Sequence, residues 1–259
     1  MDTKPYSRLS IVLKYIHYYL TSKNKHSIHS PLVYWFADKV ITESKQVSCP
    51  QIEVERNRLL HDSSFIEFQD FGKSAQVFQK QIKTIAKNSL KSKKYAQLLR
   101  GIVQNLKANK ILELGTSLGI TTSYLAYDPS VFVYTLEGAH EVIKQAQSTW
   151  NNLNKTNIKC IHGDFEISID KLPEIPFDVI YIDGNHKSKP TLLYFERLQK
   201  SCHEKTVFIF DDIHYSPSME NAWKQIKAIP YVTVTIDLFF LGLVWVDKSL
   251  SKEDFELRF

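Results

Sequence analysis

The sequence predicts an α/β protein, in which a mostly parallel sheet of seven strands ends in an antiparallel hairpin and a helical extension precedes the sheet. Two observations predict this fold. From residue 110 onward, apolar runs of strand length alternate with amphipathic runs of helix length, as in βαβ units. The last two apolar runs are separated by Asp237 and Leu238 alone, a link that permits a hairpin but is too short for a crossover.

The N-terminal part reads as helices. Leu9, Val12, Leu13 and Ile16 recur at helical spacing, and Pro31 suits the first turn of a helix. The predicted helices are Tyr6–Leu20, Pro31–Ile41, Gln51–His61, Lys73–Lys87 and Lys94–Leu106, with a loop at Asp62–Gly72. We therefore expect residues 1–109 to form a basic helical region, a cap, lid or partner-binding part, before a domain that spans residues 110–259.

The second part supplies the strands and helices of the predicted sheet. Its strand candidates are Lys110–Leu114, Val131–Leu136, Ile158–Ile161, Phe177–Ile182, Thr206–Phe210, Val232–Ile236 and Phe239–Val246. The helix candidates between and after them are Ile120–Tyr127, His140–Leu153, Phe165–Leu172, Pro190–Ser201 and Ser218–Ile229. Strands that alternate with helices in this way predict a parallel sheet with helices on both faces.

Composition excludes several classes of protein. With 259 residues, 43% hydrophobic and 12% aromatic, the chain is too apolar to be disordered. Its three cysteines are odd in number and form no CxxC pair, which argues against a disulfide framework and a thiolate zinc site. No apolar run reaches the roughly 18 residues of a membrane span, and the start lacks a signal-peptide core. We expect a cytoplasmic protein without a membrane partner.

The net charge of +5 is unevenly distributed along the chain. Residues 1–110 carry 19 Lys and Arg against 8 Asp and Glu, whereas residues 111–259 carry 14 against 20. Ten of the basic residues lie between Lys73 and Lys110, a stretch without any acidic residue. Lys80, Lys83 and Lys87 recur at helical spacing, so one positive stripe is predicted there. Such a stripe could bind RNA, although a solvated helix face is the commoner case.

A glycine loop follows the first strand of the second part. From Glu113 to Gly119, a buried strand passes through a turn into the start of a helix. Gly115 lets the chain turn sharply and approach a ligand, and Gly119 lets the helix pack closely on the strand. Because Ser117 stands where a second glycine is required, the loop is not the dinucleotide fingerprint, and a GxxxxGK[ST] phosphate loop is also absent.

Three carboxylates accompany this loop. Glu113 lies in the buried strand, where an ionised carboxylate needs a partner such as a cationic or hydroxyl-bearing cofactor. Glu137 ends the next strand, about 20 residues after the glycines, where a carboxylate accepts the ribose hydroxyls of an adenosine. Asp164, in Gly163-Asp164, follows the third strand and could face the adenine amino group.

Together, Glu113-x-Gly115-x-x-x-Gly119, Glu137 and Gly163-Asp164 resemble class I S-adenosylmethionine-dependent methyltransferases over roughly residues 110–246. With Ser117 in place of a middle glycine, the loop is most similar to the O-methyltransferase branch. The resemblance implies a Rossmann-like fold and S-adenosylmethionine bound by Glu113, Gly115, Ser117, Gly119, Glu137, Gly163, Asp164 and Asp183. The alternatives are a nucleotide-binding domain of another kind and a degenerate domain that no longer binds. Residues 25–31 resemble the N-terminal stretch of bacterial methyltransferase-like proteins, which implies a bacterial origin.

More acidic residues follow the fourth and fifth strands. Asp183 comes after Phe177–Ile182, and Asp211-Asp212 come after Thr206–Phe210. Ligands of open α/β sheets bind outside the carboxyl ends of strands, and neighbouring strands lie about 4.8 Å apart. Three carboxylates brought together in this way repel one another unless a cation holds them, and oxygen ligands suit Mg²⁺ better than zinc.

A metal here would lower the pKa of a substrate hydroxyl, and His186 is placed to take the proton. The Asp183-x-x-His186 and Asp211-Asp212 pattern resembles the macrocin-type sugar O-methyltransferases, and catechol-type enzymes have Asp-Asn in place of the acidic pair. The resemblance implies magnesium at Asp183, Asp211 and Asp212, with His186 as base; an Asp-Asp pair departs from both versions. Asp183 could instead face the methionine end of the cofactor, Asp211 could cap a loop, and Lys187 is a rival base.

The function predicted from these residues is metal-assisted O-methylation of a small hydroxylated molecule, with S-adenosylmethionine as donor and Asp183 and His186 as catalytic residues. One alternative is an RNA-binding methyltransferase that uses the basic helices. Another is a binding module without catalysis. The sequence does not identify the methyl acceptor, and it is compatible with a homodimer.

Overall fold

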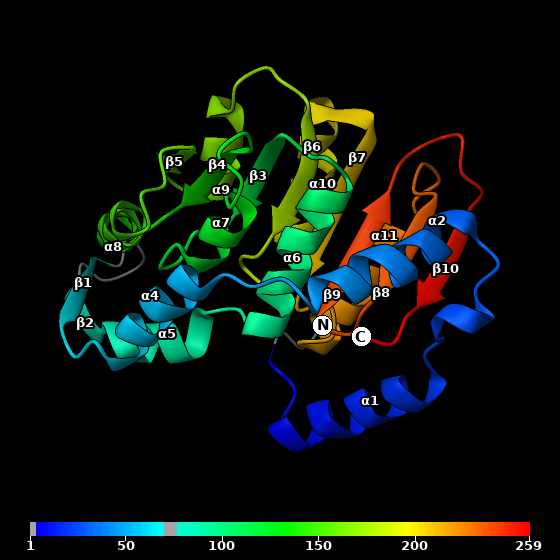
Figure 1. The fold of residues 1–259 in the computed structure, drawn as a ribbon, viewed down its shortest axis with the longest axis horizontal. Coiled ribbons are helices and arrows are strands. Elements are labelled where there is room, and N and C mark those ends of the chain that lie inside the picture. The colour runs from blue at the N-terminus through cyan, green and yellow to red at the C-terminus, as the bar shows by residue number, and fades with distance from the viewer. Residues whose placement is uncertain (1–3, 70–76) are drawn as a thin grey trace. The chain divides into compact units, whose positions relative to one another are not determined.

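The structure is a computed structural model that describes residues 4–69 and 77–259 (Figure 1). The chain folds into two compact units. Residues 43–172 form one, called here the middle unit, and residues 1–42 together with 173–259 form the other, called here the terminal unit. This division differs from the expected boundary at residue 110, because the basic first part of the chain contributes to both units.

The strands confirm the predicted α/β class. Within the middle unit the strand order is β3-β4-β5, and within the terminal unit it is β10-β8-β9-β7-β6. Seven of these strands overlap the seven that the sequence predicts. The eighth, β10 (Glu253–Glu256), is polar and short and was not predicted.

In the middle unit, β3 (Lys110–Leu114), β4 (Phe132–Glu137) and β5 (Ile158–His162) are parallel neighbours. They are followed by the helices α7 (Ile120–Leu125), α8 (His140–Asn152) and α9 (Phe165–Ser168), the last continued by a 3₁₀ turn at Ile169–Lys171. Four of the five residues of β3 are buried, as expected for a strand covered on both faces. The loops after these three strands therefore leave the sheet at the same edge.

In the terminal unit, β6 (Phe177–Ile182) and β7 (Cys202–Asp211) are parallel. The strand β9 (Leu241–Trp245) runs antiparallel to both β7 and β8 (Val234–Asp237), so the predicted hairpin is confirmed. The added strand β10 pairs in parallel with β8. The helices of this unit are α1 (Arg8–Thr21), α2 (Pro31–Trp35), α10 (Ser188–Arg197) and α11 (Pro217–Ala228), with η1 at Lys25–Ser27, η2 at Phe36–Ile41 and η4 at Leu198–Ser201.

The helices that precede the sheet in the middle unit are α4 (Pro50–His61), α5 (Ile82–Ser89) and α6 (Lys93–Asn105), and the short α3 (Thr42–Ser44) lies at the boundary between the two units. Two predictions here were wrong. The predicted loop Asp62–Gly72 contains a strand, β1 (Phe65–Gln69), and the predicted helix Lys73–Lys87 begins instead with the strand β2 (Val77–Gln81), to which β1 pairs in antiparallel register. Residues 70–76, in both predicted segments, lie outside the described residues.

Each unit has its own apolar core. In the middle unit, α4, α5 and the start of α7 share a cluster that contains Ile52, Leu59, Ile82 and the fully buried Tyr124. In the terminal unit, Phe195 of α10 packs edge-on against Phe208 of β7, with ring centroids 4.7 Å apart. Among the described residues, no helix has both the length and the apolar character that a membrane crossing requires.

Candidate functional site

The glycine loop after β3 adopts the conformation that its residues predict. Gly115, Ser117 and Gly119 all have positive φ, at 103°, 47° and 79°. At Gly119 a Cβ atom would lie 2.6 Å from Nε1 of Trp150, and that nitrogen donates a hydrogen bond of 3.1 Å to the carbonyl of Gly119. Gly119 is therefore required both by its backbone conformation and by the close packing of α8 against the loop.

Glu113 is fully buried, and the chain itself supplies donors for its carboxylate. Its Oε2 atom accepts hydrogen bonds from Oγ1 of Thr122, at 2.6 Å, and from Oγ1 of Thr135, at 2.7 Å. These two bonds join α7 and β4 to β3, which holds the glycine loop in place. The expected contact of Glu113 with a cofactor stays a prediction.

Glu137 lies directly beside the loop. Its Oε2 atom accepts a hydrogen bond of 3.0 Å from the amide of Ser117, and Oε1 accepts one of 3.1 Å from the amide of Ala139. The side chain is only partly buried. Because each carboxylate oxygen can accept more than one hydrogen bond, both oxygens keep the capacity to bind further donors.

Gly163 and Asp164 follow β5 at the same edge of the middle unit. Gly163 has a φ of 142°, and its amide donates a hydrogen bond of 3.0 Å to the carbonyl of Glu137. Asp164 caps α9 by accepting a hydrogen bond of 2.8 Å from the amide of Glu166. One role of Asp164 is thus structural, and its exposed side chain leaves it open to a ligand as well.

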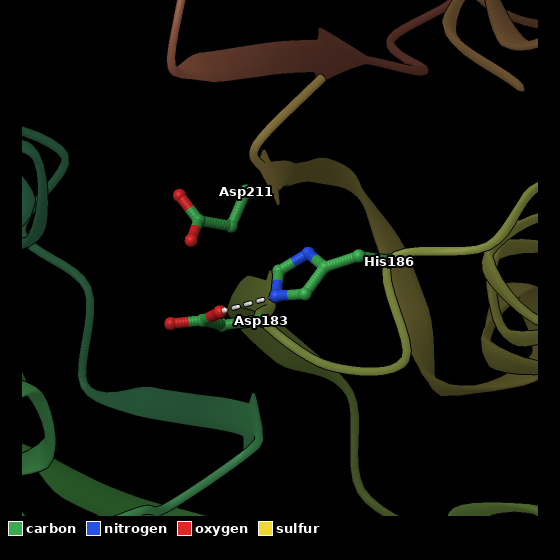
Figure 2. Close-up of side chains that lie close together, drawn as sticks. All are labelled: Asp183, His186 and Asp211. Atoms are coloured by element: carbon green, nitrogen blue, oxygen red, sulfur yellow. Dashed lines mark ion pairs between the residues drawn. The ribbon is translucent and has the colours of Figure 1, made fainter. Parts of the chain in front are cut away.

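In the terminal unit, Asp183, His186 and Asp211 converge on one small volume (Figure 2). Each offers one potential ligand atom, and these atoms lie within 4.8 Å of one another. The register of the two strands brings the carboxylates together. Ile182 of β6 is opposite Phe210 of β7, so the residues that follow them, Asp183 and Asp211, are neighbours. Nε2 of His186 lies 3.7 Å from Oδ1 of Asp183, and Asp211 is only 3% exposed.

Asp212, the third carboxylate of the predicted cluster, does not belong to this group of ligand atoms. It has a φ of 51°, and its amide donates a hydrogen bond of 2.7 Å to the carbonyl of Phe240. The chain therefore turns immediately after Asp211. The imidazole of His186 takes the third position in the cluster, and the rival base Lys187 is exposed at the N-cap of α10.

Tyr181 and Tyr215 lie beside the cluster; sequence reasoning missed Tyr181, whereas the loop that holds Tyr215 was expected to line the substrate pocket. Oη of Tyr181 donates a hydrogen bond of 2.9 Å to Oδ2 of Asp183, and the ring of Tyr215 lies 5.4 Å from that of His186. Tyr181 could have been found, because residues i and i+2 of a strand share a face. Asp237, expected only as a link between strands, lies 2.9 Å from Nε2 of His214.

His214 follows the cluster in the loop after β7. Burial alone would lower the pKa of His214, but hydrogen bonds and charge interactions with Asp237 and Glu220 outweigh burial and raise it. His214 therefore favours its protonated form, so it is poorly suited to accept a proton from a substrate.

Comparison with known proteins identifies the class of this fold. Residues 112–213, a span that contains the glycine loop, Asp183 and Asp211, match a family described as a methyltransferase domain. This span, less than half of the chain, is similar to a methyltransferase domain. The fold of the chain is that of the class I S-adenosylmethionine-dependent enzymes, as the sequence predicted. No curated protein matches its sequence.

Solved structures of O-methyltransferases share the fold. An O-methyltransferase from Bacillus cereus, solved with S-adenosylhomocysteine, is 20% identical, with 90% of this chain and 96% of that chain covered and a TM-score of 0.54. The O-methyltransferase TomG from Streptomyces achromogenes, solved with S-adenosylmethionine, is 16% identical, with 84% and 99% covered and a TM-score of 0.57. The Podospora anserina methyltransferase PaMTH1, bound to S-adenosylhomocysteine, is 14% identical, with 95% and 99% covered and a TM-score of 0.57.

Proposed function

We propose that this protein transfers the methyl group of S-adenosylmethionine to a hydroxyl of a small molecule, assisted by a divalent cation. The observation that carries the proposal is the convergence of Asp183, Asp211 and His186 at the ends of β6 and β7. Two carboxylates and an imidazole supply the two functions that hydroxyl methylation needs, a cation site and a proton acceptor.

The residues of the middle unit fit the methyl donor. Glu137 has unused acceptor capacity beside a loop whose positive φ angles let a ligand approach the backbone, and this suits the two hydroxyls of a ribose. Gly115, Ser117 and Gly119 would border the donor, and Gly163 and Asp164 would lie on the adenine side. Glu113 would act indirectly, by holding the loop through Thr122 and Thr135.

The residues of the terminal unit fit a divalent cation. Asp211 is buried and Asp183 is half-buried, and two such carboxylates so close together repel each other unless a positive charge lies between them. Carboxylate oxygens are ligands of Mg²⁺ and Mn²⁺. A cation held by Asp183 and Asp211 would lower the pKa of the acceptor hydroxyl.

His186 is the proposed base. Asp183 lies close enough to orient its imidazole and to stabilise the imidazolium that forms when it takes the hydroxyl proton. The oxygen forms a bond to the methyl carbon as the bond from that carbon to the sulfonium breaks, and S-adenosylhomocysteine leaves. The rival base Lys187 is exposed, whereas His186 is partly buried beside Asp183.

Calorimetric titration with S-adenosylmethionine tests the donor site. We expect saturable binding to the wild-type protein and binding about tenfold weaker to the Glu137→Gln variant, because an amide oxygen accepts more weakly than a carboxylate. The matched control is Glu141→Gln, an exposed glutamate of α8 that pairs with Lys144. Equal affinity of all three proteins would exclude the proposed role of Glu137.

Chelation tests the cation. With a set of catechols and sugars as acceptors, production of S-adenosylhomocysteine is expected to stop in excess EDTA and to return with Mg²⁺ or Mn²⁺. Asp183→Asn and Asp211→Asn should each reduce the rate at least 100-fold, whereas Asp212→Asn, outside the cluster, should change it little. Undiminished turnover in excess EDTA would remove the cation from the proposal.

RNA remains the second candidate acceptor. The predicted basic stripe is weakened by the structure, because Lys80 lies in β2 and only Lys83 and Lys87 lie in α5. Adding tRNA to the same assay distinguishes the two candidate acceptors. Methylation of the tRNA instead of a small molecule would favour RNA as the acceptor.

A further inference from the structure

We propose that α1 docks this protein on the surface of an anionic membrane, with its apolar face in contact with the lipid. A helix on the surface of a globular protein normally turns its apolar stripe inward. In α1 the apolar stripe faces outward instead, and its side chains are 46–72% exposed: Leu9, Val12, Leu13, Ile16, Tyr19 and Leu20. Contiguous apolar patches on a protein surface commonly mark sites of interaction.

The opposite face of α1 packs against the rest of the terminal unit, and these contacts fix the orientation of the helix. Tyr18 is buried, and its hydroxyl donates a hydrogen bond to the carbonyl of Leu257. The Tyr15 ring packs edge-on against Phe239, with centroids 5.1 Å apart, and Lys14 forms an ion pair of 2.9 Å with Glu220. These contacts fix which face of the helix is presented outward; Figure 1 shows the course of α1.

Two arginines border the exposed apolar stripe. Arg8 lies one turn before Val12, at one edge of the stripe. The guanidinium of Arg258 lies 4.4 Å from the centroid of the Tyr19 ring. The helix itself contains no acidic residue. An apolar face with basic flanks is the pattern of helices that lie in the plane of a membrane interface, where cations attract anionic lipid.

The same charges disfavour a second copy of the chain as the occupant. In a two-fold contact each helix meets its own equivalent face, so Arg8 and Arg258 would approach the basic edge of the other copy. Glu220 and Glu256 line a cavity beside α1 together with Lys14, which forms an ion pair with Glu220. A stable dimer also needs about 800 Å² from each partner, typically 20–30 residues, more than one helix face provides.

Vesicle flotation tests the proposal without any cofactor or methyl acceptor, so its result is separable from that of the methylation assays. The wild-type protein is expected to float with vesicles of phosphatidylcholine and phosphatidylglycerol and not with phosphatidylcholine alone, and added salt should weaken the binding. Leu9→Asp should lower the partition coefficient at least tenfold. The matched control is Val54→Asp on α4, since Leu9 is 69% and Val54 71% exposed.

A second variant guards against a folding defect. Arg8→Gln keeps the apolar stripe and should lower binding several-fold, and thermal unfolding by circular dichroism confirms that each variant is folded. The proposal is overturned by wild-type protein that stays unbound at low salt, or by equal binding of the Leu9→Asp and Val54→Asp variants. A dimer in sedimentation equilibrium that Leu9→Asp dissociates would also overturn it, because the face would then belong to a second copy.

Discussion

At the scale of single residues, the site depends on carboxylates whose partners differ. Oε2 of Glu113 accepts from two threonine hydroxyls within its unit, whereas Glu137 bonds two loop amides and keeps acceptor capacity. The sequence marks both positions, since each ends a strand beside the glycine loop. It does not distinguish them, because a threonine nine or twenty-two residues away gives no local signal that it will donate to Glu113.

A prediction at this scale concerns His214. Its raised pKa means that the protonated form stabilises the fold through Asp237 and Glu220. This stabilisation is fully present below the unfolded-state pKa of about 6.5 and is lost as the pH rises through the higher folded-state pKa. In urea unfolding, His214→Gln should therefore cost more stability at pH 5.5 than at pH 9. An equal loss of unfolding free energy at both pH values would show that the charge of His214 does not contribute to stability.

At the scale of elements, long segments with clear periodicity were predictable and short polar ones were not. All seven predicted strands are present, and the buried ones, such as β3, β6 and β9, read as nearly continuous apolar runs. The hairpin β1–β2 and the strand β10 were missed for opposite reasons. The spacing of lysines from β2 into α5 suggested a helix, but β2 is a strand that pairs with β1. In β10 only Phe255 is buried, and the acidic residues around it gave no apolar run from which a strand could be predicted.

The attachment of α4 to α7 gives a prediction for one pair of elements. The hydroxyl of the fully buried Tyr124 donates a hydrogen bond of 2.7 Å to Oε1 of Glu53, which also accepts from Nε of Arg56. Tyr124→Phe should lower the free energy of unfolding by about 1–2 kcal/mol, because a charged, half-buried acceptor loses one donor. Urea denaturation measures this change. A loss below about 0.3 kcal/mol would indicate that water replaces the hydroxyl.

At the scale of the whole molecule, the charge asymmetry of the sequence does not coincide with the division of the fold. Residues 1–42 join the terminal unit and residues 43–109 join the middle unit, so the basic first part serves both. Periodicity locates elements but not the contacts between distant segments, which is why a boundary at residue 110 appeared natural. The glycine loop and the acidic cluster were predictable because each follows a strand; the position of Asp212 outside that cluster was not, since it depends on a turn at that residue.

The central claim is that the carboxylates after β6 and β7 hold a divalent cation for hydroxyl methylation. Anomalous diffraction from crystals grown with S-adenosylhomocysteine and Mn²⁺ tests it most directly. We predict an anomalous peak within bonding distance, about 2.2 Å, of carboxylate oxygens of Asp183 and Asp211. A well-ordered cluster with no peak, or a peak bound only by residues elsewhere in the chain, would contradict the claim.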